Sequence, residues 1–240
     1  MAGTVLWAVQ QASMEMGLPK PTSAVSNVDL TIQQLITLLN AVGTELVIGY
    51  PWETLNKEFD ITTVAGQDSY PLPSDFAYFL FQTQWDRTNH WPLMGPKSAQ
   101  EWEWLKGGLL SSGPRIRYRL NSGKFQIHPV PAVGSTPWAL AMEYISGNWL
   151  MDGGDPSITY NMIHADDDVI LLDQWICVKY LKLKFWQAKG LDTSAYTDDF
   201  VRTWNARISK DRGGPILTLS PRPRTLLIGI NNIPDGSWTP

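Results

Sequence analysis

The sequence of 240 residues has few of the residues that most often build redox or metal sites. Its single cysteine, Cys177, cannot form a disulfide within the chain, which fits synthesis in a reducing compartment. We expect Cys177 to be a small core residue rather than a reactive thiol. His90, His128 and His164 are isolated from one another and from cysteine, so the residue spacing of a zinc site is absent.

The motifs of common catalytic sites are also missing. The chain has no Gly-x-Ser-x-Gly elbow, no phosphate-binding Gly-Lys-Ser/Thr loop and no Gly-x-Gly-x-x-Gly. Glu101 and Glu103 are two residues apart on an expected short helix, so their side chains diverge and cannot act on one atom. The run Asp166-Asp167-Asp168 lacks the ligand pattern of a calcium loop, and we assign it to the start of a helix. The sequence therefore predicts no enzyme, no cofactor and no metal site.

Long apolar runs and a strong excess of one charge are lacking too. No apolar stretch reaches the roughly 20 residues of a bilayer span, and the N-terminus lacks a basic start followed by an apolar run. We therefore expect a soluble, unexported protein without membrane contact. The net charge is only −4, with acids predominating up to residue 178 and cations from residue 179 onward. An overall basic surface, the usual mark of tight nucleic-acid binding, is absent, although a local basic patch is not excluded.

Tryptophan, in contrast, is abundant, and the 12 tryptophans are spread over the whole chain. Large aromatic residues favour extensive cores, subunit interfaces or carbohydrate platforms, so their number raises three hypotheses without choosing among them.

Four segments have the periodicity and end signals of helices. The longest is expected from Asp166 to Gly190, with acids at its start and lysines toward its end. Its apolar residues are not confined to one stripe, so we expect it to be packed on several sides. The other helices are expected at Thr4 to Met16, from the capping residues Ser26 and Asp29 to about Tyr50, and at Thr193 to Lys210.

Between Trp52 and Asp155 alternating runs and turn residues indicate an antiparallel β region. One short helix is expected there, beginning at the capping box Ser98 to Glu101. The segments Arg115 to Leu120 and Phe125 to Ile127 form the clearest hairpin. The predicted fold class is α+β, an antiparallel helical bundle with an inserted β-rich domain and an extended C-terminal arm. The predicted parts are residues 1–50 (N-terminal helices), 51–157 (β region), 158–214 (C-terminal helices) and 215–240 (arm).

Two basic segments are candidates for contacts. Arg115, Arg117 and Arg119 alternate on one strand face, with guanidiniums about 7 Å apart. That face is either solvated or contacts phosphates or an acidic neighbouring subunit. The arm either adds a strand to its own sheet or inserts into a partner by strand addition. Its candidate contact residues are Arg222, Arg224, Leu226, Leu227, Ile228 and Ile230.

Six short motifs occur in a familiar order over most of residues 30 to 210. They are Leu35 to Leu46 ending at Tyr50-Pro-Trp52, Thr63 to Phe76, Thr83 to Thr88, Gly95 to Trp102, Glu143 to Ser146, and Asp166 to Gly190 followed by Leu191-Asp192. In this order the sequence resembles the head-to-tail adaptor (connector) proteins of short-tailed bacteriophages.

The resemblance implies a structural virion protein at the head-tail junction, made in the cytoplasm of the bacterial host. Such adaptors form a homo-oligomeric ring, typically dodecameric, that docks below the portal protein and meets a tail tube or nozzle protein. Double-stranded DNA passes through the ring during genome ejection. On this reading Trp175, Trp186, Phe200 and Trp204 are candidates for helical packing and subunit interfaces, and residues 215–240 for portal docking.

A Trp-rich carbohydrate-binding module of a tail-associated protein is the alternative from another class. It is disfavoured because the aromatic residues have core-compatible spacing in expected helices and strands rather than positions on evident loops.

Overall fold

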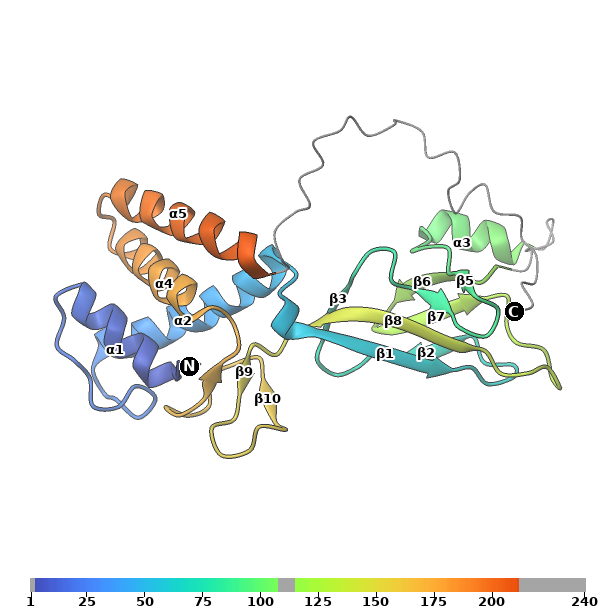
Figure 1. Ribbon diagram of the computed structural model, residues 1–240, viewed down its shortest axis with the longest axis horizontal. Coiled ribbons are helices and arrows are strands. Elements are labelled where there is room, and N and C mark those ends of the chain that lie inside the picture. Colours follow the sequence, from blue (N-terminus) through green and yellow to red (C-terminus); the bar gives the residue numbers. More distant parts are fainter. Residues whose placement is uncertain (1–2, 108–114, 212–240) are drawn as a thin grey trace.

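The computed structural model describes residues 3–107 and 115–211, and the predicted arm lies outside them. The chain folds into two lobes, a helical lobe at one end and a β lobe at the other (Figure 1). Helices and several antiparallel sheets together confirm the α+β class. The β lobe is inserted between helices that precede and follow it in the sequence.

The helical lobe contains α1 (Val5–Glu15), α2 (Leu30–Gly49), α4 (Gln174–Ala188) and α5 (Ser194–Asp211). The helix α4 lies in the middle and packs against the other three, as its dispersed apolar residues predict. Its residues Ile176, Cys177 and Leu181 are completely buried in a core that α1 and α2 also line. Burial raises the pKa of the Cys177 thiol well above its ordinary value, which agrees with a core role.

The predicted start of the long helix at Asp166 is wrong, because α4 begins only at Gln174, after the N-cap Asp173. The segment before it contains a short strand, β11 (Val169–Ile170). The Asp166 carboxylate accepts hydrogen bonds from the backbone N–H groups of Ala24 and Val25. The buried Asp168 carboxylate accepts from the backbone N–H groups of His164 and Ala165. These acids therefore hold loops in place, and they do not lie in the first turn of a helix, where they would stabilise its dipole.

Of the two capping boxes expected from the sequence, one is present in the structure and the other is not. Asp29 is itself the N-cap of α2, since its side chain accepts from the N–H of Thr31, whereas the Ser26 hydroxyl bonds to Ser23. The expected box of Ser26 with Asp29 is therefore wrong. The box of Ser98 with Glu101 is confirmed at the start of α3 (Ala99–Lys106).

Three lysines of α4 connect it to each of the other long helices. Lys182 pairs with Glu15 of α1 at 2.6 Å, Lys184 with Glu45 of α2 at 2.8 Å, and Lys179 with Asp199 of α5 at 2.5 Å. The lysines expected to complement the helix dipole thus have carboxylate partners within the chain.

The β lobe is a sandwich of two antiparallel sheets. In one sheet the long β8 (Ala139–Ser146) pairs with β1 (Asn56–Thr62) on one side and with β3 (Phe76–Phe79) and β4 (Trp85–Asp86) on the other, and β5 (Trp91–Pro92) extends β4. The second sheet has the order β2 (Ser69–Pro71), β7 (Lys124–His128), β6 (Arg117–Asn121). The expected hairpin is β6–β7, and its turn residues Ser122 and Gly123 both have positive φ.

The inner faces of the two sheets share one core. Ile61, Leu140 and Met142 come from the first sheet, and Phe125 and Ile127 from the second. The short helix α3 lies over the outer side of the second sheet, where Trp102 is buried against His128 with ring centroids 6.2 Å apart.

Residues 147–165 contain two short strands. They are β9 (Leu150–Met151) and β10 (Thr159–Tyr160), and with β11 they form a small three-stranded sheet beside the helices. Strands of two residues are too short for a periodic sequence pattern, which explains why they were not expected.

The two lobes meet where α2 ends and β1 begins. The Trp52 indole N–H donates to the Leu46 carbonyl at 2.8 Å, and the Tyr78 hydroxyl donates to the Val47 carbonyl at 3.1 Å. The Asp211 carboxylate at the end of α5 accepts from the Glu53 N–H at 3.1 Å. These bonds connect the last turn of α2 and the end of α5 with the base of the β lobe.

Helix α2 is long and apolar enough, by length and composition alone, to cross a membrane, contrary to the expectation that no segment is. Its residues Leu35, Leu39 and Val42 are completely buried among the other helices. A core helix of this kind passes the same test, so the packing accounts for its composition.

Asp75 makes the base of the β lobe sensitive to acid. Its carboxylate accepts from Lys57 at 2.6 Å, Ser146 at 2.8 Å and Tyr144 at 3.0 Å. Burial raises the pKa of Asp75, but the bonds from Lys57, Ser146 and Tyr144 outweigh it, so the pKa lies below its ordinary value of 3.8.

A carboxyl with a lowered pKa stabilises the folded state fully above its unfolded-state pKa, and this contribution is lost as the pH falls through the folded-state pKa. We expect Asp75→Asn to lose about 2 kcal/mol of unfolding free energy at pH 7. The variant should also show a smaller decline between pH 5 and the acid limit than the parent. Urea unfolding across this pH range measures both, and parallel pH curves would contradict the assignment.

Candidate functional site

The predicted interface residues Phe200 and Trp204 lie together on the face of α5 that covers α4 and the end of α2. Phe200 stacks on Tyr180 with ring centroids 4.6 Å apart. Trp204 meets Trp52 edge to face at 5.7 Å. Both rings are half-buried, so each has an intrachain packing role and an exposed remainder. Both rings pack between helices of the chain, and a contact with another subunit stays a prediction.

The structure places Trp175 and Trp186 apart from that pair and from each other. Trp175, in the first turn of α4, meets Trp7 of α1 edge to face at 5.5 Å. Trp186, in the last turn, stacks on Tyr196 of α5 at 5.6 Å. The four predicted residues therefore form no single cluster, because their rings contact partners on different helices and at different ends of α4.

Most tryptophans in the described part of the chain are buried or half-buried. Trp52, Trp102 and Trp149 are buried, whereas only Trp85 and Trp104 among those described are classed as exposed, at 38% and 59%. A carbohydrate platform needs several accessible rings in one place. The distribution favours cores over such a platform.

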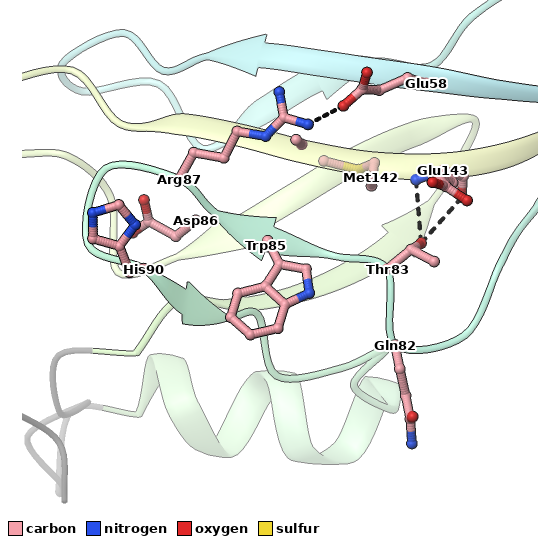
Figure 2. A pocket seen from close by; sticks show the side chains of 10 residues that line it. Glu58, Gln82, Thr83, Trp85, Asp86, Arg87, His90, Met142 and Glu143 are labelled. Carbon is pink, nitrogen blue, oxygen red and sulfur yellow. Dashed lines mark hydrogen bonds and ion pairs between the residues drawn. The ribbon is translucent and has the colours of Figure 1, made fainter. Parts of the chain in front are cut away.

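The outer face of the sheet that contains β8 has a shallow hollow of 440 Å³ beside Trp85 (Figure 2). Trp85 projects from β4, and Arg87 reaches over β8 to form an ion pair with Glu58 of β1. Thr83 bonds through its hydroxyl to the backbone of Glu143. Ala141 of β8 also lines the hollow.

This face was not identified from the sequence as a candidate. The sequence has no hydrophobic alternation that could have found it, because the buried residues Gln84 and Asp86 are polar whereas the exposed Trp85 is apolar. The residues that line the hollow include no pair placed for acid–base catalysis. The Asp86 carboxylate accepts from the N–H groups of Thr88 and Asn89, which is a turn-forming role.

The arginines predicted on one strand face do share a face, but it is not simply solvated. Arg115, Arg117 and Arg119 are half-buried, while the alternate residues Ile116 and Tyr118 are buried in the sandwich core. Burial raises the pKa of Tyr118 to about 12.

Helix α3 covers part of this face. The Arg119 guanidinium lies 4.9 Å from the centre of the Trp102 ring and donates to the Gln126 side-chain oxygen at 2.7 Å. These contacts hold Arg119 in one orientation. Contact of these arginines with phosphates or with a neighbouring subunit stays a prediction.

Within residues 3–107 and 115–211 no group of three His, Cys, Asp or Glu side chains is arranged to hold a metal ion. The predicted arm contacts Arg222, Arg224, Leu226, Leu227, Ile228 and Ile230 lie outside the described residues. The site that the described residues offer is thus a set of surfaces on two lobes.

Comparison with known proteins assigns the chain to a family. A search among curated proteins finds no match. The family model of the SU10 adaptor protein matches residues 4–218, which include all of the helices and strands of both lobes. This match agrees with the order of motifs that resembles head-to-tail adaptors of short-tailed phages. The chain belongs to the SU10 adaptor protein family, and it is a bacteriophage adaptor protein.

Proposed function

We propose that this chain is a structural head-to-tail adaptor that forms a ring below the portal, joins the portal to the tail and lines the path of the exiting DNA. The observation that carries the proposal is the family match over residues 4–218. The ring is a homo-oligomer at the head-tail junction of the virion. Its partners are the portal protein on one side and a tail tube or nozzle protein on the other.

The exposed apolar residues of the helical lobe support assembly with further copies. Val28, Leu30 and Ile48 are 89%, 80% and 69% exposed in the single chain. Helix α5 has 18 residues and none that is buried, so it lies on the outside of the lobe. In the ring the four long helices act as a bundle that packs beside the bundle of the next copy. The exposed remainders of Trp175, Trp186, Phe200 and Trp204 take part in these contacts.

The charge distribution of the helical lobe suits DNA that passes without being held. Tight binding of DNA needs cations that neutralise phosphates. Lys179, Lys182 and Lys184 have carboxylate partners within the chain, and the net charge is −4. A channel lined by this lobe would therefore not bind the phosphates strongly.

Assembly with the portal tests the proposal. Purified protein is mixed with the isolated portal protein of the same phage and studied by light scattering and negative-stain electron microscopy. We expect a ring stacked coaxially on the portal ring. A persistent monomer that ignores the portal would contradict the proposal, and its retention on glycans would favour the carbohydrate-binding alternative.

The arm of residues 215–240 is proposed to dock in the portal through Arg222, Arg224 and the apolar residues that follow them. Deleting residues 215–240 should weaken portal binding at least about tenfold, since burial of a few apolar side chains contributes more than about 1.4 kcal/mol. The dissociation constant of labelled portal measures the effect.

A matched variant keeps the length of the arm and changes Leu226, Leu227, Ile228 and Ile230 to serine. It should lose as much affinity as the deletion if the apolar residues make the contact. Portal affinity that both changes leave intact would remove the arm from the mechanism.

A further inference from the structure

The first sheet of the β lobe has an acidic outer face. In β1 the residues Phe59 and Ile61 point toward the core, so Glu58 and Asp60 point away from it. Their side chains are 48% and 63% exposed. Glu143 of β8 lies directly opposite Glu58 in the strand register. We call Glu58, Asp60 and Glu143 the acidic face.

Folding alone does not explain this arrangement. Like charges directly opposite each other on neighbouring strands are destabilising. Arg87 pairs with Glu58 and lies 3.6 Å from Asp60, so one guanidinium serves two carboxylates. The acidic face therefore keeps an excess of negative charge that a cation from outside the chain can neutralise.

The second sheet has a basic outer face, part of which α3 covers. Arg117 and Arg119 of β6 point away from the core, and Lys124 of β7 lies opposite Asn121 on the same side. Lys106, in the last turn of α3, adds a further cation beside His128. Burial lowers the pKa of His128, and the positive charges of Arg117 and Lys106 lower it further. We call Arg117, Arg119, Lys124 and Lys106 the basic face.

The two faces point in opposite directions because the sheets share the core between them. A closed ring of identical subunits that pack head to tail needs two different, complementary surfaces on opposite sides of each subunit. We infer that the acidic face of one copy packs against the basic face of the next copy, so that the sandwich forms the lateral contact of the ring in the β lobe. This inference rests on the proposed ring.

The hollow beside Trp85 gives the acidic face a place for a long cationic side chain. It is open to solvent, and Glu58, Glu143 and Arg87 are among the residues that line it. An incoming guanidinium there meets carboxylates and an aromatic ring together. DNA is the other partner that the basic face could take, but it would leave the excess charge on the acidic face without a partner.

Paired charge reversals test the inference in the full-length chain. One variant carries Glu58→Lys and Asp60→Lys, a second carries Arg117→Glu and Lys124→Glu, and a third carries all four changes. Either double variant should lose the ring, because like charges then face each other across the contact. The fourfold variant, in which the two changed pairs again have opposite signs, should form the ring again. Native mass spectrometry and negative stain, with and without portal, measure the ring.

Two controls separate this result from misfolding and from net charge. Asp155→Lys with Asp167→Lys adds the same charge as the first variant at exposed loop positions outside both faces and outside the long helices, and it should leave the ring intact. Circular dichroism and thermal unfolding show whether each variant is folded. The parent ring should also dissociate as the salt concentration rises, since salt screens exposed charges.

The outcomes are distinct. If the parent forms a ring and both double variants also do, the inference is wrong while the proposed function stands. If the second variant keeps the ring but loses retention on DNA, the basic face binds phosphates and the inference is again wrong. If the parent forms no ring even with portal, the proposed function itself fails.

Discussion

Gly43→Val should destabilise the protein by more than about 4 kcal/mol and leave little folded material. Gly43 is a buried residue of α2, and a Cβ at this position would lie 2.1 Å from the Trp149 ring. The ring cannot easily move away, because it is completely buried and its N–H donates to the Asn161 carbonyl at 2.9 Å. Even Gly43→Ala should cost about 2 kcal/mol, although alanine favours the helix.

Gly49 provides the matched control in the same helix. It is exposed, and the nearest atom to an added Cβ would be 4.0 Å away on Trp204. Gly49→Ala should therefore be neutral or stabilise by up to about 1 kcal/mol. Thermal and urea unfolding measure all three variants. Equal stability of the Gly43 and Gly49 alanine variants would show that α2 does not lie this close to Trp149.

Lys182→Ala should cost about 2 to 3 kcal/mol. The Lys182 side chain is only 9% exposed and pairs with Glu15, which is 25% exposed. Removing one partner of a buried pair leaves the other charge without compensation, and the partial exposure of Glu15 reduces the usual penalty. Burial raises the pKa of Glu15, but the hydrogen bonds from Lys182 and Gln11 outweigh this effect, so the pKa lies below its ordinary value of 4.5.

The parent should lose unfolding free energy as the pH falls from 5 to the acid limit. Lys182→Ala should lose less over the same range, because the contribution of Glu15 is already absent in it. Lys184→Ala is the control, since its pair with Glu45 is 26% and 43% exposed and should contribute less than about 1 kcal/mol. The double variant Glu15→Leu with Lys182→Met should recover most of the stability, because apolar side chains of similar size replace the pair. A double variant as unstable as Lys182→Ala would contradict this account.

Local signals in the sequence predicted the elements whose causes are local. The box of Ser98 with Glu101 starts α3, and the turn at Ser122 and Gly123 closes the β6–β7 hairpin. They were predictable because the hydrogen bonds that define a cap or a tight turn lie within a few residues.

The start of the long helix was not predictable in the same way. Asp166 and Asp168 have the composition of a first helical turn, but their carboxylates bond to backbone N–H groups outside a helix. Asp166 bonds to Ala24, which is 142 residues away in the sequence. A contact over such a distance leaves no periodic pattern by which it could be recognised.

The candidate surfaces also differ in how far local sequence patterns could predict them. Alternation predicted that Arg115, Arg117 and Arg119 share one face, and the strand register places Arg117 and Arg119 in this way, whereas Arg115 precedes β6. The cover of α3 over Arg119 and the acidic face of the opposite sheet depend on how two sheets and a helix pack, so they required the structure.

The sequence by itself determined the class of elements, their order and the family, because helix periodicity, caps, turns and motif order are local properties of the chain. Only the tertiary structure decided which residues each charge and each aromatic ring meets. The lysines of α4 are an example: their spacing predicts a helix end, yet each contacts a carboxylate on a different helix. The physical reason is that pairing and burial depend on distances in space between residues far apart in sequence, which the packing of the two lobes sets.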